Sequence, residues 1–220
     1  MTKKLGLIHT SATLVPVFQD LIDKHLKGKD IKVFNIVDDS LIKNTIERNK
    51  LTEDTSRRVV DYVGSAEAAG ADYILVTCSS IGPAVEASAS LTKVPVLRVD
   101  QPMADQAVQM GSKIGVVATL PTTLEPTSDL VRRRAIAAGK EIELTAKLCD
   151  GAFEALMGGQ SEKHDAMVAE ALKELSTKVD VILLAQASMA RVVGQLSEED
   201  KKVPILASPE IAMEHLAKIL

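Results

Sequence analysis

The chain alternates short apolar segments with longer segments in which apolar residues recur at helical spacing. The short segments are rich in Val, Ile and Leu and predict strands near residues 4–9, 31–37, 72–77, 95–99, 113–118, 141–148, 180–185 and 204–207. The longer segments predict helices near residues 13–27, 53–69, 83–91, 103–110, 123–138, 161–177, 188–195 and 209–219. Strands that alternate with helices in this way are typical of βαβ units on a parallel sheet.

The second half of the chain repeats the first. The segment DYILVTCSS at residues 72–80 returns as DVILLAQAS at residues 180–188, and LGLIHT at residues 5–10 matches IGVVAT at residues 114–119. VPVL in the first half likewise returns as VPIL in the second. A repeat of half the chain has the size of a small domain, so it indicates an internal duplication. The two copies differ where one has Cys78 and the other has glutamine.

The duplication predicts two α/β lobes with parallel sheets. We place the first lobe at residues 1–108, the second at 109–208, and a C-terminal helix at 209–220 that packs back on the first lobe. Open parallel sheets bind ligands at the carboxyl ends of their strands, and no Gly/Ser linker separates the halves, so we expect a ligand cleft between the lobes. Small, hydroxylated or polar residues, which suit an anionic ligand, lie at those ends at residues 9–13, 37–40, 77–80, 118–123, 148–151 and 185–188.

Cys78 is the main candidate for chemistry. It follows the apolar strand YILVT and precedes Pro83, which fits the first turn of a helix. The positive end of a helix dipole favours a thiolate, so Cys78 is a candidate base or nucleophile; the alternative is a buried, inert cysteine at a strand end. The other cysteine, Cys149, also ends an apolar strand and aligns with Asp38 in the repeat. We interpret Cys149 as structural rather than catalytic.

Composition narrows the function classes. The 220 residues carry a net charge of −4 with two Tyr, three Phe and no Trp, which does not suit nucleic-acid binding. The run Arg132–Arg134 lies in a predicted helix, where consecutive side chains diverge, so it forms no single basic surface.

No apolar stretch reaches the ~20 residues of a membrane helix, and the N-terminal segment does not resemble a signal peptide. We therefore expect a cytoplasmic protein with free thiols and no membrane partner. Without a phosphate-binding glycine motif or metal-ligand spacing, no cofactor or metal is predicted.

The motifs resemble those of the aspartate/glutamate/hydantoin racemase superfamily, and the resemblance covers essentially the whole chain. The T-C-N-T motif of that superfamily matches residues 77–80, its G-T-x-x-T motif matches residues 118–122 without the glycine, and its D-S motif falls on His9–Thr10. Its second cysteine falls on Gln186. The opening of the chain also resembles the arylmalonate decarboxylase branch, which works with one catalytic thiol, although that thiol lies in the second lobe.

The resemblance implies two pseudo-symmetric, flavodoxin-like lobes, a homo-oligomer such as a dimer, and a cofactor-independent isomerase that acts at a carbon next to a carboxylate. The candidate catalytic residues are then Cys78, Gln186 and His9. His9 could supply the acid that the missing cysteine would have supplied; the alternative is a histidine held by structural hydrogen bonds. The candidates for binding the substrate carboxylate, several of which also suit helix N-caps, are Thr10, Ser11, Ser79, Ser80, Thr119, Thr122, Ala187 and Ser188.

A single thiol opposite an amide leaves several reactions open. Two-base racemisation needs an acid on the face opposite the base, and the amide of Gln186 does not exchange protons usefully near neutral pH. An amino-acid racemase or related isomerase is the leading interpretation. The alternatives are a one-thiol decarboxylase or cis–trans isomerase of the same superfamily, and a carboxylate-binding sensor that has lost catalysis. Each of these interpretations predicts that the protein binds a small molecule that carries a carboxylate.

Overall fold

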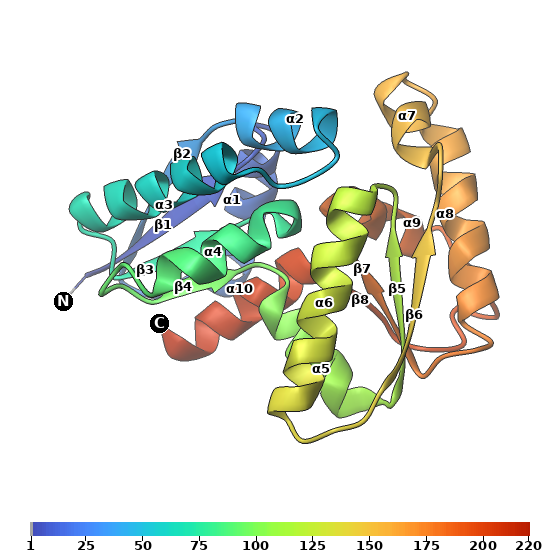
Figure 1. The fold of residues 1–220 in the computed structure, drawn as a ribbon. Coiled ribbons are helices and arrows are strands. Elements are labelled where there is room, and N and C mark those ends of the chain that lie inside the picture. The colour runs from blue at the N-terminus through green and yellow to red at the C-terminus, as the bar shows by residue number, and fades with distance from the viewer. Residues whose placement is uncertain (1) are drawn as a thin grey trace. The chain divides into compact units, whose positions relative to one another are not determined.

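The chain forms two α/β units with the same strand order (Figure 1). The computed structural model describes residues 2–220; the first unit reaches Asp100 and includes Pro209–Leu220, and the second unit is Gln101–Ser208. Within the described residues each unit contains one four-stranded sheet, ordered β2-β1-β3-β4 in the first and β6-β5-β7-β8 in the second, with all neighbouring strands parallel. The predicted α/β fold with two parallel-sheet lobes is confirmed.

Helices cover both faces of the first sheet. Its strands are β1 (Lys3–His9), β2 (Ile31–Val37), β3 (Tyr73–Val76) and β4 (Val96–Arg98). Its helices are α1 (Leu14–His25), α2 (Ser40–Glu47), α3 (Glu53–Ala68), the short 3₁₀ helix η1 (Ser79–Ile81), α4 (Gly82–Ala89) and α10 (Ser208–Ile219). Because strand side chains alternate between faces, Leu7 packs with Phe18 of α1 and Met213 of α10, whereas Ile8 packs with Val59 of α3 and Val85 of α4.

The second unit repeats this plan. Its strands are β5 (Lys113–Ala118), β6 (Glu143–Leu148), β7 (Val181–Leu184) and β8 (Ile205–Ala207). Its helices are α5 (Gln101–Met110), α6 (Pro121–Ala137), α7 (Ala152–Met157), α8 (Ser161–Leu175), η2 (Ala187–Met189) and α9 (Ala190–Val193). Ala152, Val168 and Val192 bring α7, α8 and α9 into one apolar cluster with β5 and β7. Helix α6 contacts β5 and β6, and α5 contacts β7 and β8.

The boundary between the units differs from the prediction. Helix α5 follows β4 in the chain but belongs to the second unit, where Met103, Ala104 and Ala107 are buried. Helix α10 follows β8 but belongs to the first unit. The boundary therefore lies between Asp100 and Gln101, and the predicted boundary between residues 108 and 109 is wrong. The sequence repeat marks where the duplicated segments meet, whereas the packing of the apolar face of α5 decides which unit contains it.

Two helices of the structure were not predicted, α2 and α7. They have eight and six residues, too few for a helical pattern of apolar positions to be recognised. They occupy equivalent places in the two units, because α2 follows β2 and α7 follows β6, which are the second strands of their units in chain order. The backbone N–H of Asp38 donates to the carbonyl of His9, and that of Cys149 donates to the carbonyl of Ala118. The predicted alignment of Cys149 with Asp38 is confirmed by this shared hydrogen bond.

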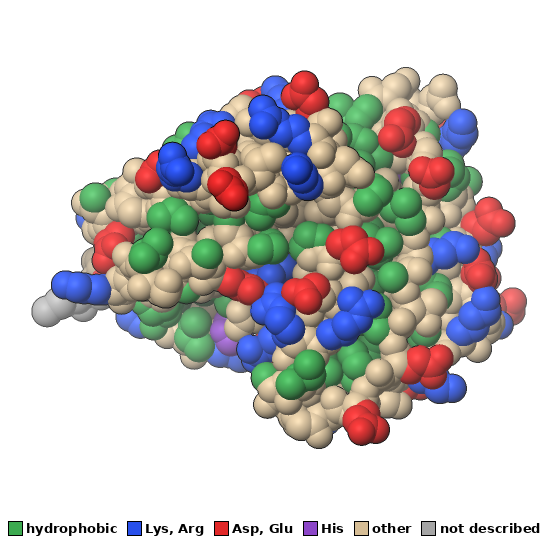
Figure 2. Space-filling view, in the orientation of Figure 1, with side chains coloured by type: hydrophobic (Ala, Val, Ile, Leu, Met, Phe, Trp, Pro, Cys, Tyr) green, Lys and Arg blue, Asp and Glu red, His purple; other side chains and the backbone are tan. Residues whose placement is uncertain are grey.

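Charged side chains of both signs are interspersed on the face shown in Figure 2. The three consecutive arginines lie in α6, as predicted, and two of them pair with carboxylates of the second unit: Arg133 with Asp129 at 2.7 Å, and Arg134 with Asp105. Within residues 2–220, every helix is too short or too polar to cross a membrane.

Candidate functional site

Cys78 lies at the carboxyl edge of the first sheet, between β3 and η1. The apolar run of β3 ends where the Thr77 N–H donates to the carbonyl of Ile8 at 3.0 Å, and Cys78 itself keeps an extended backbone. Its sulfur accepts hydrogen bonds from the hydroxyls of Thr10 and Ser80 and from the backbone N–H groups of Ser80 and Ile81. The structure therefore brings two predicted binding residues, Thr10 and Ser80, to the half-buried thiol of Cys78.

The pKa of the Cys78 thiol is higher than the helix-dipole argument predicts. Burial raises the pKa of Cys78 above its ordinary value, and the hydrogen bonds from Thr10, Ser80 and Ile81 oppose this shift without reversing it. The donors at the helix start are present, as expected. The expectation that they favour the thiolate overall is wrong for the free protein, because desolvation of the sulfur has the larger effect.

His9 is held on both sides of its ring. The side chain is fully buried, with Nδ1 2.9 Å from the hydroxyl of Thr77 and Nε2 2.9 Å from Oδ1 of Asn35. Burial lowers the pKa of His9, although the hydrogen bond to Asn35 opposes the shift. A neutral ring whose two nitrogens both bond to protein groups is poorly suited to supply a proton to a substrate. The structure favours the alternative interpretation, in which His9 is structural and aligns Thr77 beside Cys78.

Gln186 occupies in the second unit the place of Cys78 in the first. Each residue follows the third strand of its sheet and precedes a 3₁₀ helix, and their backbone angles are nearly the same. The Oε1 of Gln186 accepts hydrogen bonds from the backbone N–H of Thr119 at 2.5 Å and from its hydroxyl at 2.9 Å. Thr119 and Thr10 are equivalent in the repeat. The hydroxyl that donates to a sulfur in the first unit thus donates to an amide oxygen in the second.

Thr122 has a buried hydroxyl for which the described residues offer no hydrogen-bond partner. It lies in the first turn of α6, just after Pro121, and the N-cap residue is Leu120, which makes no side-chain cap. Thr122 therefore does not cap α6, although its residue type suits an N-cap. A buried hydroxyl without a partner is costly, which points to a ligand or water at this position.

The other predicted binding residues have varied exposure. Ser79 and Ser80 are buried, Ser11 and Ala187 are half-buried, and Ser188 is exposed. The hydroxyl of Ser11 lies 2.7 Å from that of Thr13. Ala187 contributes only its backbone to any ligand, because its side chain has no polar atom.

Cys149 is the less accessible of the two free thiols. It is 5% exposed at the end of β6, where it packs with Ala152 and Val168. Burial raises the pKa of Cys149 to about 11, and the charge of Lys147 opposes the shift only in part. These properties match the structural role expected from the sequence.

Sequence reasoning missed a polar network at the end of β2. Asp38 accepts hydrogen bonds from the backbone N–H and hydroxyl of Ser40 at 3.0 and 2.7 Å and from the hydroxyl of Tyr62 at 2.7 Å, and it pairs with Arg58. Burial alone would raise the pKa of Asp38, but these partners together lower it. The network fixes the start of α2, a helix that contacts η1 after Cys78. The Asp-Asp-Ser sequence was the available signal.

One group among the described residues could hold a cation: His25, Glu210 and Glu214, whose ligand atoms lie within 4.8 Å of one another. Glu210 already accepts from His25 at 2.7 Å and from Lys24 at 2.5 Å. The group therefore works as an ion-pair cluster that ties α10 to α1.

Comparison with known proteins gives one family. The family model described as Asp/Glu/Hydantoin racemase matches residues 5–216. Among solved structures, the chain is similar to a glutamate racemase isoform of Bacillus anthracis (TM-score 0.72, 17% identity, 99% of this chain and 81% of that chain). It is also similar to an aspartate racemase of Picrophilus torridus (0.73, 14%, 98% and 94%) and an allantoin racemase of Klebsiella pneumoniae (0.68, 16%, 99% and 87%). A search of curated proteins gave no match. At these identities the structural neighbours establish the fold.

Proposed function

Because this chain belongs to the Asp/Glu/hydantoin racemase family, we propose that it is a cofactor-independent isomerase in which Cys78 moves a proton at a carbon next to a carboxylate. Family membership supports a racemase-type enzyme and leaves the specific reaction open. The substrate class, a small carboxylate such as an amino acid or a derivative, and the role of the thiolate are parts of the proposal. So is the sequence-based expectation that Cys78 and Gln186 contact the same substrate.

The convergence of hydrogen-bond donors on the sulfur of Cys78 carries the proposal. Two hydroxyls, from Thr10 and Ser80, and two backbone N–H groups, from Ser80 and Ile81, all donate to it. Donors that are already in place cost no reorganisation when negative charge forms, so they suit a thiolate that takes a proton from carbon. An inert core cysteine such as Cys149 has no comparable set.

Gln186 leaves Cys78 as the only member of this residue pair that can exchange a proton with the substrate. Its amide oxygen uses both donors of Thr119, and its amide does not take or supply a proton near neutral pH. A single thiol inverts the carbon only when the planar enolate intermediate turns over before the thiol returns the proton, so exchange with solvent is faster than inversion. We therefore propose one-base proton transfer as the chemistry of this chain.

Thr122 supports binding of the substrate carboxylate. Its hydroxyl is buried and without a partner among the described residues, and it lies in the first turn of a 17-residue helix, where the helix dipole favours an anion. A carboxylate oxygen that accepts from this hydroxyl would satisfy the group. The same contact would hold the adjacent carbon in a fixed orientation.

The proposal makes activity dependent on pH. Only the thiolate of Cys78 removes a proton, and burial raises the pKa of this thiol above its ordinary value. The thiolate is thus a minor species at neutral pH, and the rate of proton exchange should increase with pH until Cys78 titrates.

Solvent-deuterium exchange tests the proposal. Amino acids, dicarboxylates, hydantoins and malonates are incubated in D₂O with the wild type, Cys78→Ala and the matched control Cys149→Ala, and exchange at the carbon next to the carboxylate is followed by NMR. We expect exchange with the wild type and Cys149→Ala and none with Cys78→Ala. Equal exchange with Cys78→Ala contradicts the role of this thiol.

A second candidate function is a carboxylate-binding sensor, which the raised pKa of Cys78 favours because a protonated thiol is a poor base. A sensor should be stabilised against heat by the same acids in the wild type and in Cys78→Ala, without exchange in either. Exchange in the wild type excludes it.

A further inference from the structure

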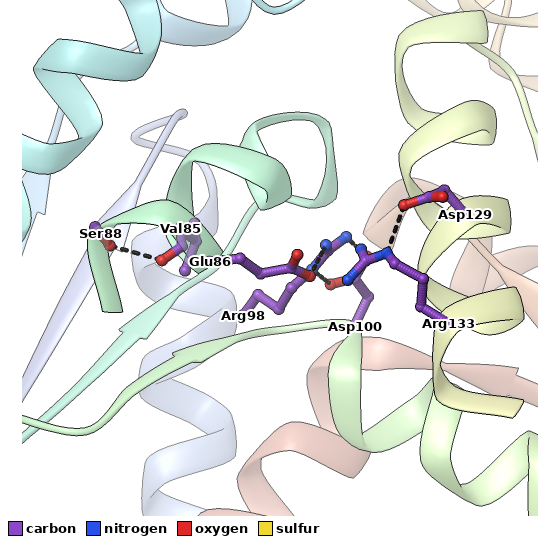
Figure 3. A network of polar contacts seen from close by, with 7 residues as sticks. All are labelled: Val85, Glu86, Ser88, Arg98, Asp100, Asp129 and Arg133. Carbon is purple, nitrogen blue, oxygen red and sulfur yellow. Dashed lines mark hydrogen bonds and ion pairs between the residues drawn. The ribbon is translucent and has the colours of Figure 1, made fainter. Parts of the chain in front are cut away.

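Arg98 is a buried cation held by two carboxylates at the end of β4 (Figure 3). Its Nε and Nη2 donate to the two oxygens of Asp100 at 2.7 and 2.8 Å, and its Nη1 donates to Glu86 at 2.6 Å. Arg98 is 1% exposed and Asp100 is fully buried. The paired hydrogen bonds to Asp100 fix the plane of the guanidinium, and the bond to Glu86 fixes it to α4.

The guanidinium of Arg98 fills the space next to Gly82. A Cβ added to Gly82 would lie 2.3 Å from Cζ and 2.3 Å from Nη2 of Arg98. The backbone of Gly82 is helical, with φ −50° and ψ −44°, which any residue adopts. Glycine is therefore required here by the close approach of Arg98 rather than by the backbone conformation.

Gly82 ends the turn that supplies donors to Cys78. The backbone N–H of Gly82 donates to the carbonyl of Ser79, and the N–H groups of the two residues between them, Ser80 and Ile81, donate to the sulfur of Cys78. A shift of Gly82 would change the direction of those two N–H groups. Arg98 thus contacts the element that places half of the donors to the sulfur.

The second unit lacks this arrangement where it lacks the thiol. Strand pairing places Arg98 beside Val76 in the first sheet and Ala207 beside Leu184 in the second. Gly82 and Ala190 each follow a 3₁₀ helix at the equivalent point. The unit that has glutamine in place of Cys78 therefore has alanine in place of both the glycine and the arginine.

We propose that Arg98, held by Asp100 and Glu86, is a positioning residue that fixes the Gly82 end of the donor turn around Cys78. This inference rests on the proposed function, in which Cys78 is the reactive thiol. Arg98 acts through the turn: its guanidinium has carboxylate partners and packs against Gly82. Arg98 and its two carboxylate partners thereby keep the N–H groups of the turn directed at the sulfur of Cys78.

The test measures the pH dependence of alkylation of Cys78 by iodoacetamide, with peptide mass spectrometry to locate the label. The variants are Gly82→Ala, Arg98→Lys and the double variant, with Ala190→Gly as the matched control in the second unit. Cys149 serves as an internal reference in each sample, because unfolding would speed the alkylation of both thiols. Circular dichroism verifies the fold.

Gly82→Ala and Arg98→Lys should each slow the alkylation of Cys78 at pH 8 and leave Cys149 unchanged. A misplaced turn that raises the thiol pKa by one unit lowers the rate about tenfold below that pKa. Ala190→Gly should match the wild type. Gly82→Ala should have a smaller effect in the Arg98→Lys background, because the narrower ammonium leaves space for the Cβ.

An unchanged or faster reaction of Cys78 in folded Arg98→Lys, with Cys149 unchanged, overturns the positioning role. Strictly additive effects of the two substitutions also overturn it. If Gly82→Ala unfolds the chain and exposes both thiols, the result for Arg98→Lys decides. The titration uses no substrate, so a wild type without deuterium exchange contradicts the proposed function and leaves this test intact.

Discussion

Replacing Gln186 with alanine should destabilise the second unit through Thr119. The substitution removes the amide oxygen that accepts from the backbone N–H of Thr119 at 2.5 Å and from its hydroxyl at 2.9 Å. Thr119 is 3% exposed, so its N–H loses a partner in a place that water reaches poorly.

An unsatisfied buried donor costs about 1–3 kcal/mol of unfolding free energy. Gln186 is half-buried, so water can replace part of the lost bonding and the lower half of this range is expected. For a chain of this size, each kcal/mol corresponds to a decrease in Tm of roughly 2–4 °C. We therefore expect a decrease of several degrees.

The assay is thermal and urea unfolding followed by circular dichroism, with two comparison variants. Gln186→Glu keeps an acceptor oxygen for Thr119 and should lose little stability. Ser188→Ala, an exposed position nearby, should stay within about 0.5 kcal/mol of the wild type. If Gln186→Ala unfolds at the same urea concentration as the wild type, the amide does not hold Thr119 and this reasoning is refuted.

Three further predictions concern other parts of the molecule. Burial lowers the pKa of His9 from 6.5, so the unfolded chain binds a proton at higher pH than the native protein; the stability that neutral His9 provides is present above pH 6.5 and is lost as the pH falls below it. The loss is at most about 1.4 kcal/mol per pH unit, and urea unfolding at several pH values should show it in the wild type and a flatter dependence in His9→Gln. Iodoacetamide should label half-buried Cys78 before Cys149, which is only 5% exposed, and a bound carboxylate should protect Cys78; faster labelling of Cys149 contradicts the assignment. Met213→Ala should cost about 2–5 kcal/mol in urea unfolding, because this fully buried side chain of α10 packs in the core of the first unit, and a cost near zero would contradict that packing.

Local pattern and the internal repeat were sufficient to predict most of the fold. The apolar runs at β1, β3, β5 and β7 form strands that are mostly buried, and the repeat alone placed Cys78 and Gln186 at equivalent positions. The boundary at Asp100 was not predictable in the same way. It depends on which sheet the apolar face of α5 contacts, and a single sequence does not contain that information.

The sequence predicted which residue types lie at the candidate site, but it did not predict the pKa of Cys78 there. The sequence placed Thr10 and Ser80 near Cys78, but the balance between hydrogen bonds and desolvation depends on how deeply the sulfur lies. The partners of His9 come from β2 and β3, far apart in the chain, so its two hydrogen bonds could not be deduced. Arg98 was overlooked for the same reason, because only the folded chain brings it to Gly82.

The relative rates of exchange and inversion test the central claim most directly. For a substrate that exchanges, deuterium incorporation and chirality at the same carbon are measured in the same sample by NMR and chiral chromatography. With Cys78 as the only base, deuterium should enter faster than the configuration inverts. Gln186→Cys, which places a thiol at the equivalent position of the second unit, should increase inversion relative to exchange. Inversion by the wild type as fast as exchange would contradict the one-base account.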